Sequence, residues 1–201
     1  MTCFQRCGTH RWGCCLATFF AIAISFHSLS CASRPILDPA SRTSYREELK
    51  DAIAALLQVN GFSKYALETL APALSSGPNG LFCQNLTILA PSTAALMRVS
   101  DDSFNVSDSI RISEFTVLAT RMTYSEIMAH PDDQPLPTLE GSSLSKVTAT
   151  RADGTPDYVV FVQPDGAVAA GRSATIVAAD VYLGPTLAIH GIDSVLFPPV
   201  G

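Results

Sequence analysis

The run from Leu187 to Pro198 places one imidazole and one carboxylate inside an otherwise apolar segment. Its first half predicts a strand that enters the core. Gly191 then marks a point where the backbone bends or is closely approached by another part of the chain. A second apolar stretch follows and is stopped by Pro198 and Pro199. The run therefore predicts a closing strand with a built-in turn, with His190 and Asp193 near its centre.

This run resembles the C-terminal signature of fasciclin domains. That signature is a small apolar residue, His-Gly, Ile or Val, Asp, two variable or aliphatic positions, Leu and Pro. Residues 87–96 resemble the N-terminal signature, in which a strand ends at Ala-Pro and a hydroxyl residue opens a helix. Thr93 and Leu96 stand where the family usually has an acidic or amide residue and Phe. The signature residues through which the resemblance implies interaction are Thr87, Pro91, Ser92, His190, Gly191 and Asp193.

The resemblance covers residues 44–198 and implies an α+β fold, with N-terminal helices packed on a β-sheet wedge. The overall pattern is similar to that of plant fasciclin-like arabinogalactan proteins, although the chain lacks clear arabinogalactan repeats. Family members commonly carry Tyr-His where this chain has Phe115 and Thr116. The implied role is adhesion or interaction in the extracellular matrix or cell wall, without catalysis. The implied partners are extracellular glycans or cell-surface proteins, a second copy of the chain included.

Residues 1–32 are predicted to be a signal peptide. They contain no acidic residue, begin with Arg6, His10 and Arg11, continue through an apolar run and end in small residues suited to cleavage. The apolar run is shorter than the roughly 20 residues that span a bilayer, and an uncleaved anchor is the alternative. We expect a lead-in over residues 33–43, one domain over 44–199, and a secreted product without a stable membrane anchor.

Cleavage at that site removes five of the six cysteines and leaves Cys83. A small buried hydrophobe is one interpretation of Cys83, and intermolecular pairing is the other. Cleavage after Ser30 would retain Cys31 as a partner for it. The full chain carries a net charge of −5, and the cleaved chain is more acidic because Arg6 and Arg11 are lost. Such a balance argues against nucleic acid as a partner.

Helical spacing comes first along the chain, and strand-like runs follow. Ser44 to Glu47 resembles a capping box that opens a helix ending at Gly61, and Ser63 is the predicted cap of a second short helix. Ser92 is the predicted cap of a third. The other predicted elements are helices at 107–114 and from the capping box at 123–126 to His130, strands at 86–89, 115–118, 136–139, 144–150, 158–162 and 174–182, and turns at 75–79, Asp153-Gly154 and Asp165-Gly166.

The predicted mature chain has few residues suited to catalysis or metal binding. Its two histidines are His130 and His190, and the sequence has no His-Glu-x-x-His motif, nucleophile elbow or phosphate-binding glycine loop. We therefore expect no metal and no cofactor. His190 and Asp193 could act as a base and its orienting partner in a degenerate hydrolase. The alternative is that His190 is a buried, hydrogen-bonded strand residue and Asp193 binds backbone donors at the Gly191 turn.

Asn85 and Asn105 each begin an N-glycosylation sequon, which a secretory leader makes usable. Arg151 to Asp153 superficially resembles an adhesion triplet but is better explained as part of a turn. The pairs Asp101-Asp102 and Asp132-Asp133 are predicted to be solvated loop charges, not calcium ligands. The expected function is that of a secreted, N-glycosylated, non-catalytic interaction module, and the main alternative is a carrier of a small apolar ligand or lipid.

Overall fold

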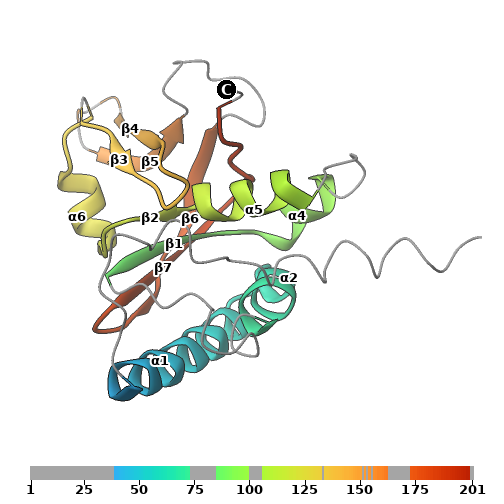
Figure 1. The fold of residues 1–201 in the computed structure, drawn as a ribbon. Helices are drawn as coiled ribbons and strands as arrows, with labels where there is room; N and C mark the ends of the chain where they lie inside the picture. Colours follow the sequence, from blue (N-terminus) through green and yellow to red (C-terminus); the bar gives the residue numbers. More distant parts are fainter. Residues whose placement is uncertain are drawn as a thin grey trace, which may run out of the picture.

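A computed structural model describes residues 39–72, 85–99, 106–132, 134–150, 152, 154, 156–162 and 173–199. Within these residues the chain is α+β, with helices at its N-terminal end packed on one seven-stranded sheet (Figure 1). This confirms the predicted class and the predicted place of the helices. The predictions that lie outside the described residues are the signal peptide, Cys83, Asn105, Asp101-Asp102, the 75–79 turn, the Asp165-Gly166 turn, and Arg151 and Asp153.

The first helix, α1 (Pro39–Gln58), begins five residues before its predicted cap. Ser44 therefore lies inside the helix, because Pro39 suits a first helical turn, where its missing N–H is not needed. A turn at Gly61 follows, with φ of 95°. The chain then continues into α2 (Ser63–Tyr65) and the π-helical η1 (Ala66–Leu70). Phe62, not Ser63, occupies the cap position of α2, and it makes no side-chain cap hydrogen bond.

The middle of the chain follows the sequence pattern closely. After β1 (Leu86–Pro91), Ser92 caps α4 (Thr93–Val99) by accepting a 3.1 Å hydrogen bond from the Ala95 N–H. Thr123 and Glu126 form the predicted capping box of α6 (Tyr124–Ala129). Between them lie α5 (Val106–Phe115) and the short β2 (Val117–Leu118). Phe115 thus ends a helix, and the strand predicted from 115 is shorter than expected.

The remaining strands are β3 (Leu136–Pro137), β4 (Ser143–Thr150), β5 (Pro156–Val162), β6 (Ser173–Leu183) and β7 (Leu187–Ile192). The strand order is β2-β1-β7-β6-β5-β4-β3, and β1 and β7 are parallel while the other neighbours are antiparallel. The β2 region also bonds to residues next to β3, since the Leu139 N–H donates to the Val117 carbonyl at 2.9 Å. The sheet therefore curls until its two ends meet.

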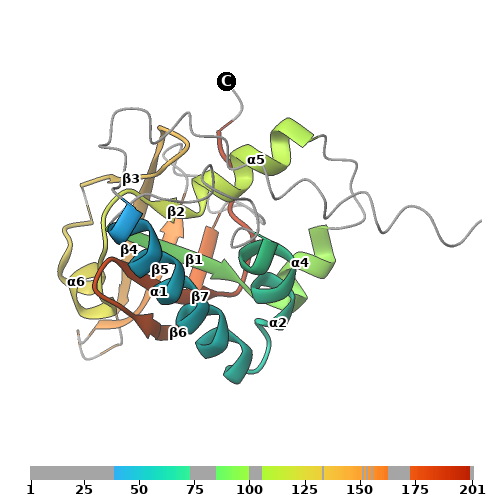
Figure 2. The same ribbon diagram turned by 60° about the horizontal axis from the view of Figure 1, so that its bottom comes forward.

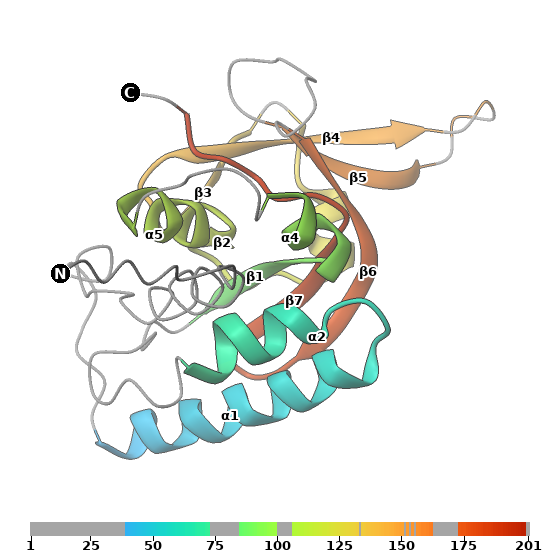
Figure 3. The same ribbon diagram turned by 90° about the vertical axis from the view of Figure 1, so that its right-hand side faces the viewer.

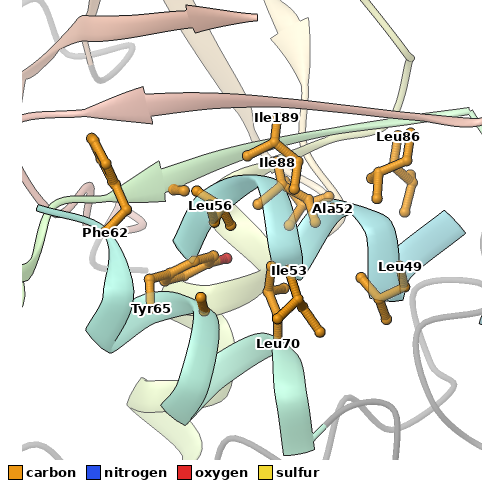
Figure 4. Packing of buried hydrophobic residues seen from close by; sticks show 14 of the residues in the cluster. Leu49, Ala52, Ile53, Leu56, Phe62, Tyr65, Leu70, Leu86, Ile88 and Ile189 are labelled. Carbon is orange, nitrogen blue, oxygen red and sulfur yellow. The ribbon is translucent and has the colours of Figure 1, made fainter. Parts of the chain in front are cut away.

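Two hydrophobic cores lie on opposite sides of β1 and β7, because strand side chains alternate between faces. The first core packs α1, α2 and η1 against one side, as Figures 2 and 4 show; it includes Leu49, Ala52, Leu56, Phe62, Tyr65, Leu70, Ile88 and Ile189. The second core lies inside the curled sheet together with α5 and α6; it includes Leu89, Phe115, Ile127, Val159, Phe161, Ile176 and Ile192. Among the described residues, no helix is both long enough and apolar enough to cross a bilayer.

Candidate functional site

The two signature segments lie side by side as the parallel strands β1 and β7. Their register runs from Leu86 opposite Leu187 to Pro91 opposite Ile192, and every residue of both strands is buried. Leu89 of the second core lies opposite His190. Because side chains alternate along a strand, Thr87 and His190 are both directed toward the inside of the curled sheet. The structure thus brings the predicted signature residues together in the centre of the fold.

Thr87 and His190 both bind Met122, in the segment that leads into α6. The Met122 N–H donates to Thr87 Oγ1 at 2.8 Å, and the Met122 carbonyl lies 3.0 Å from His190 Nε2. Thr87 Oγ1 also donates to the Thr120 carbonyl at 2.7 Å. Neither side chain is measurably exposed. These hydrogen bonds satisfy backbone groups that would be costly to bury unpaired, so both signature residues fix the 120–122 segment to the sheet.

His190 is neutral in this environment. Its Nδ1 accepts a 3.0 Å hydrogen bond from the Asp180 N–H, so the ring proton is on Nε2 and is donated to Met122. Burial lowers the pKa of His190 below its usual value of 6.5, and the hydrogen bond to Met122 and the Asp180 charge only partly oppose this. Asp180 adopts a positive φ of 47° in an irregular part of β6, which aims its N–H at the ring. The predicted buried strand histidine is confirmed.

Asp193 bonds to β6 and not to His190. Its Oδ1 accepts from the Thr175 N–H at 2.9 Å, while its own N–H donates to the Thr175 carbonyl at 3.1 Å. The ring nitrogens of His190 are already bound to Asp180 and Met122. The alternative of a His190–Asp193 catalytic pair is therefore wrong. The competing prediction is confirmed in part: Asp193 binds a backbone donor, but this donor is the Thr175 N–H of β6 and does not belong to a turn at Gly191.

Gly191 is a point of close approach. A Cβ atom there would lie 2.3 Å from Cζ of Phe62, far inside van der Waals contact. The strand continues through Gly191 to Ile192, so the predicted close approach at Gly191 is confirmed and the predicted bend and built-in turn are wrong. Only glycine lets the Phe62 ring pack directly on the β7 backbone. Pro91 ends β1 beside Ile192, and the Ser92 N–H donates to the Ile192 carbonyl at 2.9 Å. These signature residues also serve the fold.

Asn85, the described sequon asparagine, is exposed directly before β1 and has a φ of 60°. Asparagine tolerates this left-handed conformation better than most residues. The next residue enters the sheet, since the Leu86 N–H donates to the Thr186 carbonyl at 2.9 Å. A glycan on the Asn85 side chain would therefore meet solvent, although the sequon hydroxyl of Thr87 is buried.

The sequence interpretation missed Glu48, a buried carboxylate on α1. It accepts from the Thr186 N–H at 2.9 Å, the Leu187 N–H at 2.8 Å and the Thr186 hydroxyl at 2.5 Å. Glu48 thus holds the turn between β6 and β7 against the helix. A Cβ atom at Gly184 would lie 2.0 Å from Glu48 Oε1, so this turn needs glycine there. Helical spacing from buried Tyr45 and Ala52 places Glu48 on the inner face, and that spacing was the signal available in the sequence.

Lys146, a second buried charge, faces the inside of the sheet from β4. Its Nζ lies 2.6 Å from Asp132 Oδ1 and donates to the Thr148 hydroxyl at 2.7 Å and the Met128 carbonyl at 3.2 Å. Asp132 also accepts from the Thr148 N–H at 3.1 Å. The hydrogen bond from Lys146 is the largest cause that lowers the pKa of Asp132. Asp132 is about half exposed, but it is a structural partner of Lys146 and Thr148, so the prediction of a merely solvated loop charge is wrong for this residue.

Two observations on the described residues bear on metal and ligand binding. Those residues include no group of three or more histidine, cysteine or acidic side chains placed to hold a metal ion. A hollow of about 240 Å³ lies beside α1 and is lined by Thr43, Arg46, Glu47 and Lys50. Its polar lining does not suit the small apolar ligand of the carrier hypothesis.

No family model matches the sequence. No curated protein matches it either. The chain is similar to a solved FAS1 domain pair from the insect cell adhesion molecule fasciclin I, with 19% sequence identity and a TM-score of 0.48. The similarity covers 76% of this chain and 46% of that structure's chain, so the chain spans about half its length.

Proposed function

We propose that this protein is a secreted, N-glycosylated fasciclin-type domain that acts as a non-catalytic adhesion or interaction module outside the cell. Its partners would be extracellular glycans or cell-surface proteins. The plant cell wall is the setting that the sequence resemblance favours. Residues 1–32 would be removed as a signal peptide, and the domain would extend over residues 44–199, with α1 beginning somewhat before it.

The observation that carries the proposal is the pairing of the two signature segments. They lie far apart in the sequence and resemble the two ends of one fasciclin domain, and they are neighbouring strands in register over six residues. Thr87 from one segment and His190 from the other bind the same residue, Met122. If the two resemblances had arisen by chance, the two segments would have no reason to meet in one hydrogen-bonded unit. Their pairing therefore supports a single fasciclin-type domain.

The chemistry of His190 favours binding over catalysis. A general base needs a free ring nitrogen that a substrate proton can reach. Both nitrogens of His190 are engaged, and the side chain is fully buried. Asp193 is held by the Thr175 N–H. The signature residues therefore support the fold, and the partner must meet other, exposed residues.

Expression of the full chain in a eukaryotic secretory host tests this proposal. The medium is analysed by intact mass with and without N-glycosidase, for the native chain and for Asn85→Gln, Asn105→Gln and the double variant. We expect a product that starts near Ser33 and loses glycan mass at each sequon. A chain that stays in the cell without glycans would contradict the extracellular role.

Binding is tested on the recovered protein with a glycan array and with protein-coated beads added to cells. We expect retention on one class of extracellular ligand. His190→Gln is the matched control, because glutamine can still donate to Met122 and accept from Asp180. Unchanged binding by this variant would show that the His190 side chain does not contribute directly to binding of the partner. A secreted protein that binds neither glycans nor cells would remove the support for adhesion.

A further inference from the structure

One side of β4, β5 and β6 carries apolar and uncharged side chains that the rest of the described protein leaves in contact with solvent. We call this surface the bare face; its residues are Val147, Ala149, Tyr158, Val160, Thr175 and Val177. Val147, Tyr158 and Val177 are 45%, 43% and 57% exposed. Monomeric proteins rarely leave contiguous apolar surface open without a use.

Strand register makes the bare face continuous. Val147 lies opposite Val160, which lies opposite Thr175 on the next strand, and Ala149 lies opposite Tyr158. Val177 follows Thr175 by two residues on β6, beyond the pairing with β5 and at an irregularity in the pairing with β7, and it is exposed to solvent. The alternate residues, such as Val159 and Phe161, point the other way into the second core. Figure 3 shows β4 and β5 at the opposite end of the molecule from α1 and α2, whose packing covers β1 and β7.

Among the described residues of β4 and β5, the charged residues Lys146 and Asp157 alternate with the bare-face residues and so belong to the other side of these strands. Lys146 is buried toward α6, where it binds the Met128 carbonyl. Burial is the largest cause that raises the pKa of Tyr124, and the charges of Asp157 and Asp180 add to it, so Asp157 lies near the start of α6. No residue of the bare face carries a charge, although the chain as a whole has a net charge of −5.

The absence of charge on the bare face favours an uncharged surface as its partner. Two copies of an acidic chain repel each other where charged surfaces meet, and an uncharged face removes that cost. A charged partner, such as an acidic polysaccharide, would find no opposite charge there and would lose hydration on contact. A second bare face offers β-branched and aromatic side chains of the same kind, which pack well between two facing sheets.

Pairing along the free edge of β4 is disfavoured. Beyond its short pairing with β3, the outer edge of β4 includes Thr148, whose N–H already donates to Asp132. Lys146 points a charge inward from the same strand. A covered N–H and an inward charge are two ways in which proteins block association at a sheet edge.

We propose that the bare face is where two copies of this chain associate, face to face, as a symmetric pair. Apolar burial drives the association, so raised salt does not dissociate the pair. The pair would supply a homophilic contact for the proposed adhesion role. The biological use of the pair rests on that proposed function. The self-association does not rest on that function, because it can be measured on the purified chain whether or not the protein is secreted.

Sedimentation velocity and light scattering over a wide concentration range test the proposal, with reductant present to exclude disulfide-linked species. We expect the native chain to form dimers, and Val177→Asp and Val147→Asp to weaken the dimer by about tenfold or more. The matched control is Met97→Asp, because Met97 is 56% exposed but lies on α4. The control should leave the dimer unchanged, and equal urea midpoints would show that all variants fold.

Three results would overturn the proposal: a chain that stays monomeric at every concentration, a dimer that persists in both bare-face variants, or equal weakening by Met97→Asp. Binding of the monomer to phosphatidylcholine vesicles that is lost in Val177→Asp would assign the face to a membrane instead. A chain that dimerises as expected but is neither secreted nor glycosylated would leave this inference intact and contradict the proposed function.

Discussion

Thr87 and His190 lie on neighbouring parallel strands and bind the two backbone polar groups of one residue, Met122. Thr87 accepts the Met122 N–H and His190 donates to its carbonyl, so the two side chains clamp the segment that leads into α6. The clamp thus connects β1 and β7, which resemble the two ends of the domain, through Met122 in the middle of the sequence. It also explains why a hydroxyl and an imidazole occur inside two otherwise apolar strands.

The clamp predicts a large and coupled loss of stability on mutation. Thr87→Val leaves the Met122 N–H buried without its acceptor and should cost about 1–3 kcal/mol. His190→Ala leaves a cavity as well as unpaired groups on Met122 and Asp180, and should cost about 2–5 kcal/mol. Urea unfolding measures both. Because the two residues share Met122, the double variant should depart from additivity by about 0.5–3 kcal/mol. Strict additivity would show that the two hydrogen bonds act independently.

Stability should fall at mildly acidic pH because of His190. Burial lowers the pKa of this ring below its usual 6.5 in the folded protein. The unfolded chain therefore takes up a proton first as the pH falls below about 6.5, and the folded state loses free energy until the folded pKa is passed. The nearest charge, Asp180, lies 3.6 Å from Nδ1 and moderates the loss.

The free energy of unfolding, measured by urea titration from pH 8 to pH 5, checks this prediction. The matched control is His190→Gln, which keeps one donor and one acceptor but does not titrate. Its stability curve should be flatter than that of the native chain between the same limits. Equal slopes for the two proteins would assign the pH dependence to other groups.

Several elements were predictable because their signals are local. The caps at Ser92 and Thr123 depend on residues within one helical turn, and both form as predicted. The prediction at Ser44 was wrong because the same kind of local signal occurs within a longer helix. Strands β4 to β6 follow from their own alternation and lie close to their predicted limits.

The contacts that hold the site were not predictable from such patterns. The bond from His190 to Met122 depends on the register of β7 and on the path of the loop before α6, and no short pattern specifies either. Asp180 adds a left-handed residue at an irregularity in β6. The acidic residue that appears closest to His190 in the sequence, Asp193, instead binds β6. Sequence proximity therefore suggested the wrong carboxylate.

Gly184 and Glu48 should show a steric dependence that can be rescued. In Gly184→Ala the new methyl group would collide with Glu48 Oε1, so the carboxylate must leave the turn or the turn must move. We expect a loss of several kcal/mol, as for other changes that break a buried hydrogen-bond network. Glu48→Ala alone should also destabilise the protein, because the N–H groups of Thr186 and Leu187 lose their acceptor.

The double variant Gly184→Ala, Glu48→Ala removes the carboxylate and the shortest contact of the new methyl group, and leaves its 2.8 Å approach to Tyr182 Cε1. Its loss of stability should be smaller than the sum of the two single losses, because the 2.0 Å clash exists only when Glu48 is present. Thermal unfolding of the four proteins measures this difference. A double variant as unstable as the sum would mean that the backbone at residue 184, and not Glu48, sets the cost.

Replacement of Asp132 should destabilise the protein more than the exposure of Asp132 suggests, because Asp132 pairs with the buried Lys146. Asp132→Ala leaves the buried Lys146 ammonium without its carboxylate and frees the Thr148 N–H on the edge of β4. Because Asp132 is about half exposed, we expect a loss of about 1–3 kcal/mol, below the 3–5 kcal/mol typical of a fully buried broken pair. Lys146→Met in the same background removes the unpaired charge and should restore part of the stability.

Urea unfolding of the native chain, Asp132→Ala and the double variant measures these changes, and light scattering follows whether the uncovered edge promotes aggregation. A double variant less stable than Asp132→Ala would show that the bonds from Lys146 to Met128 and Thr148, and not its charge, dominate at this site.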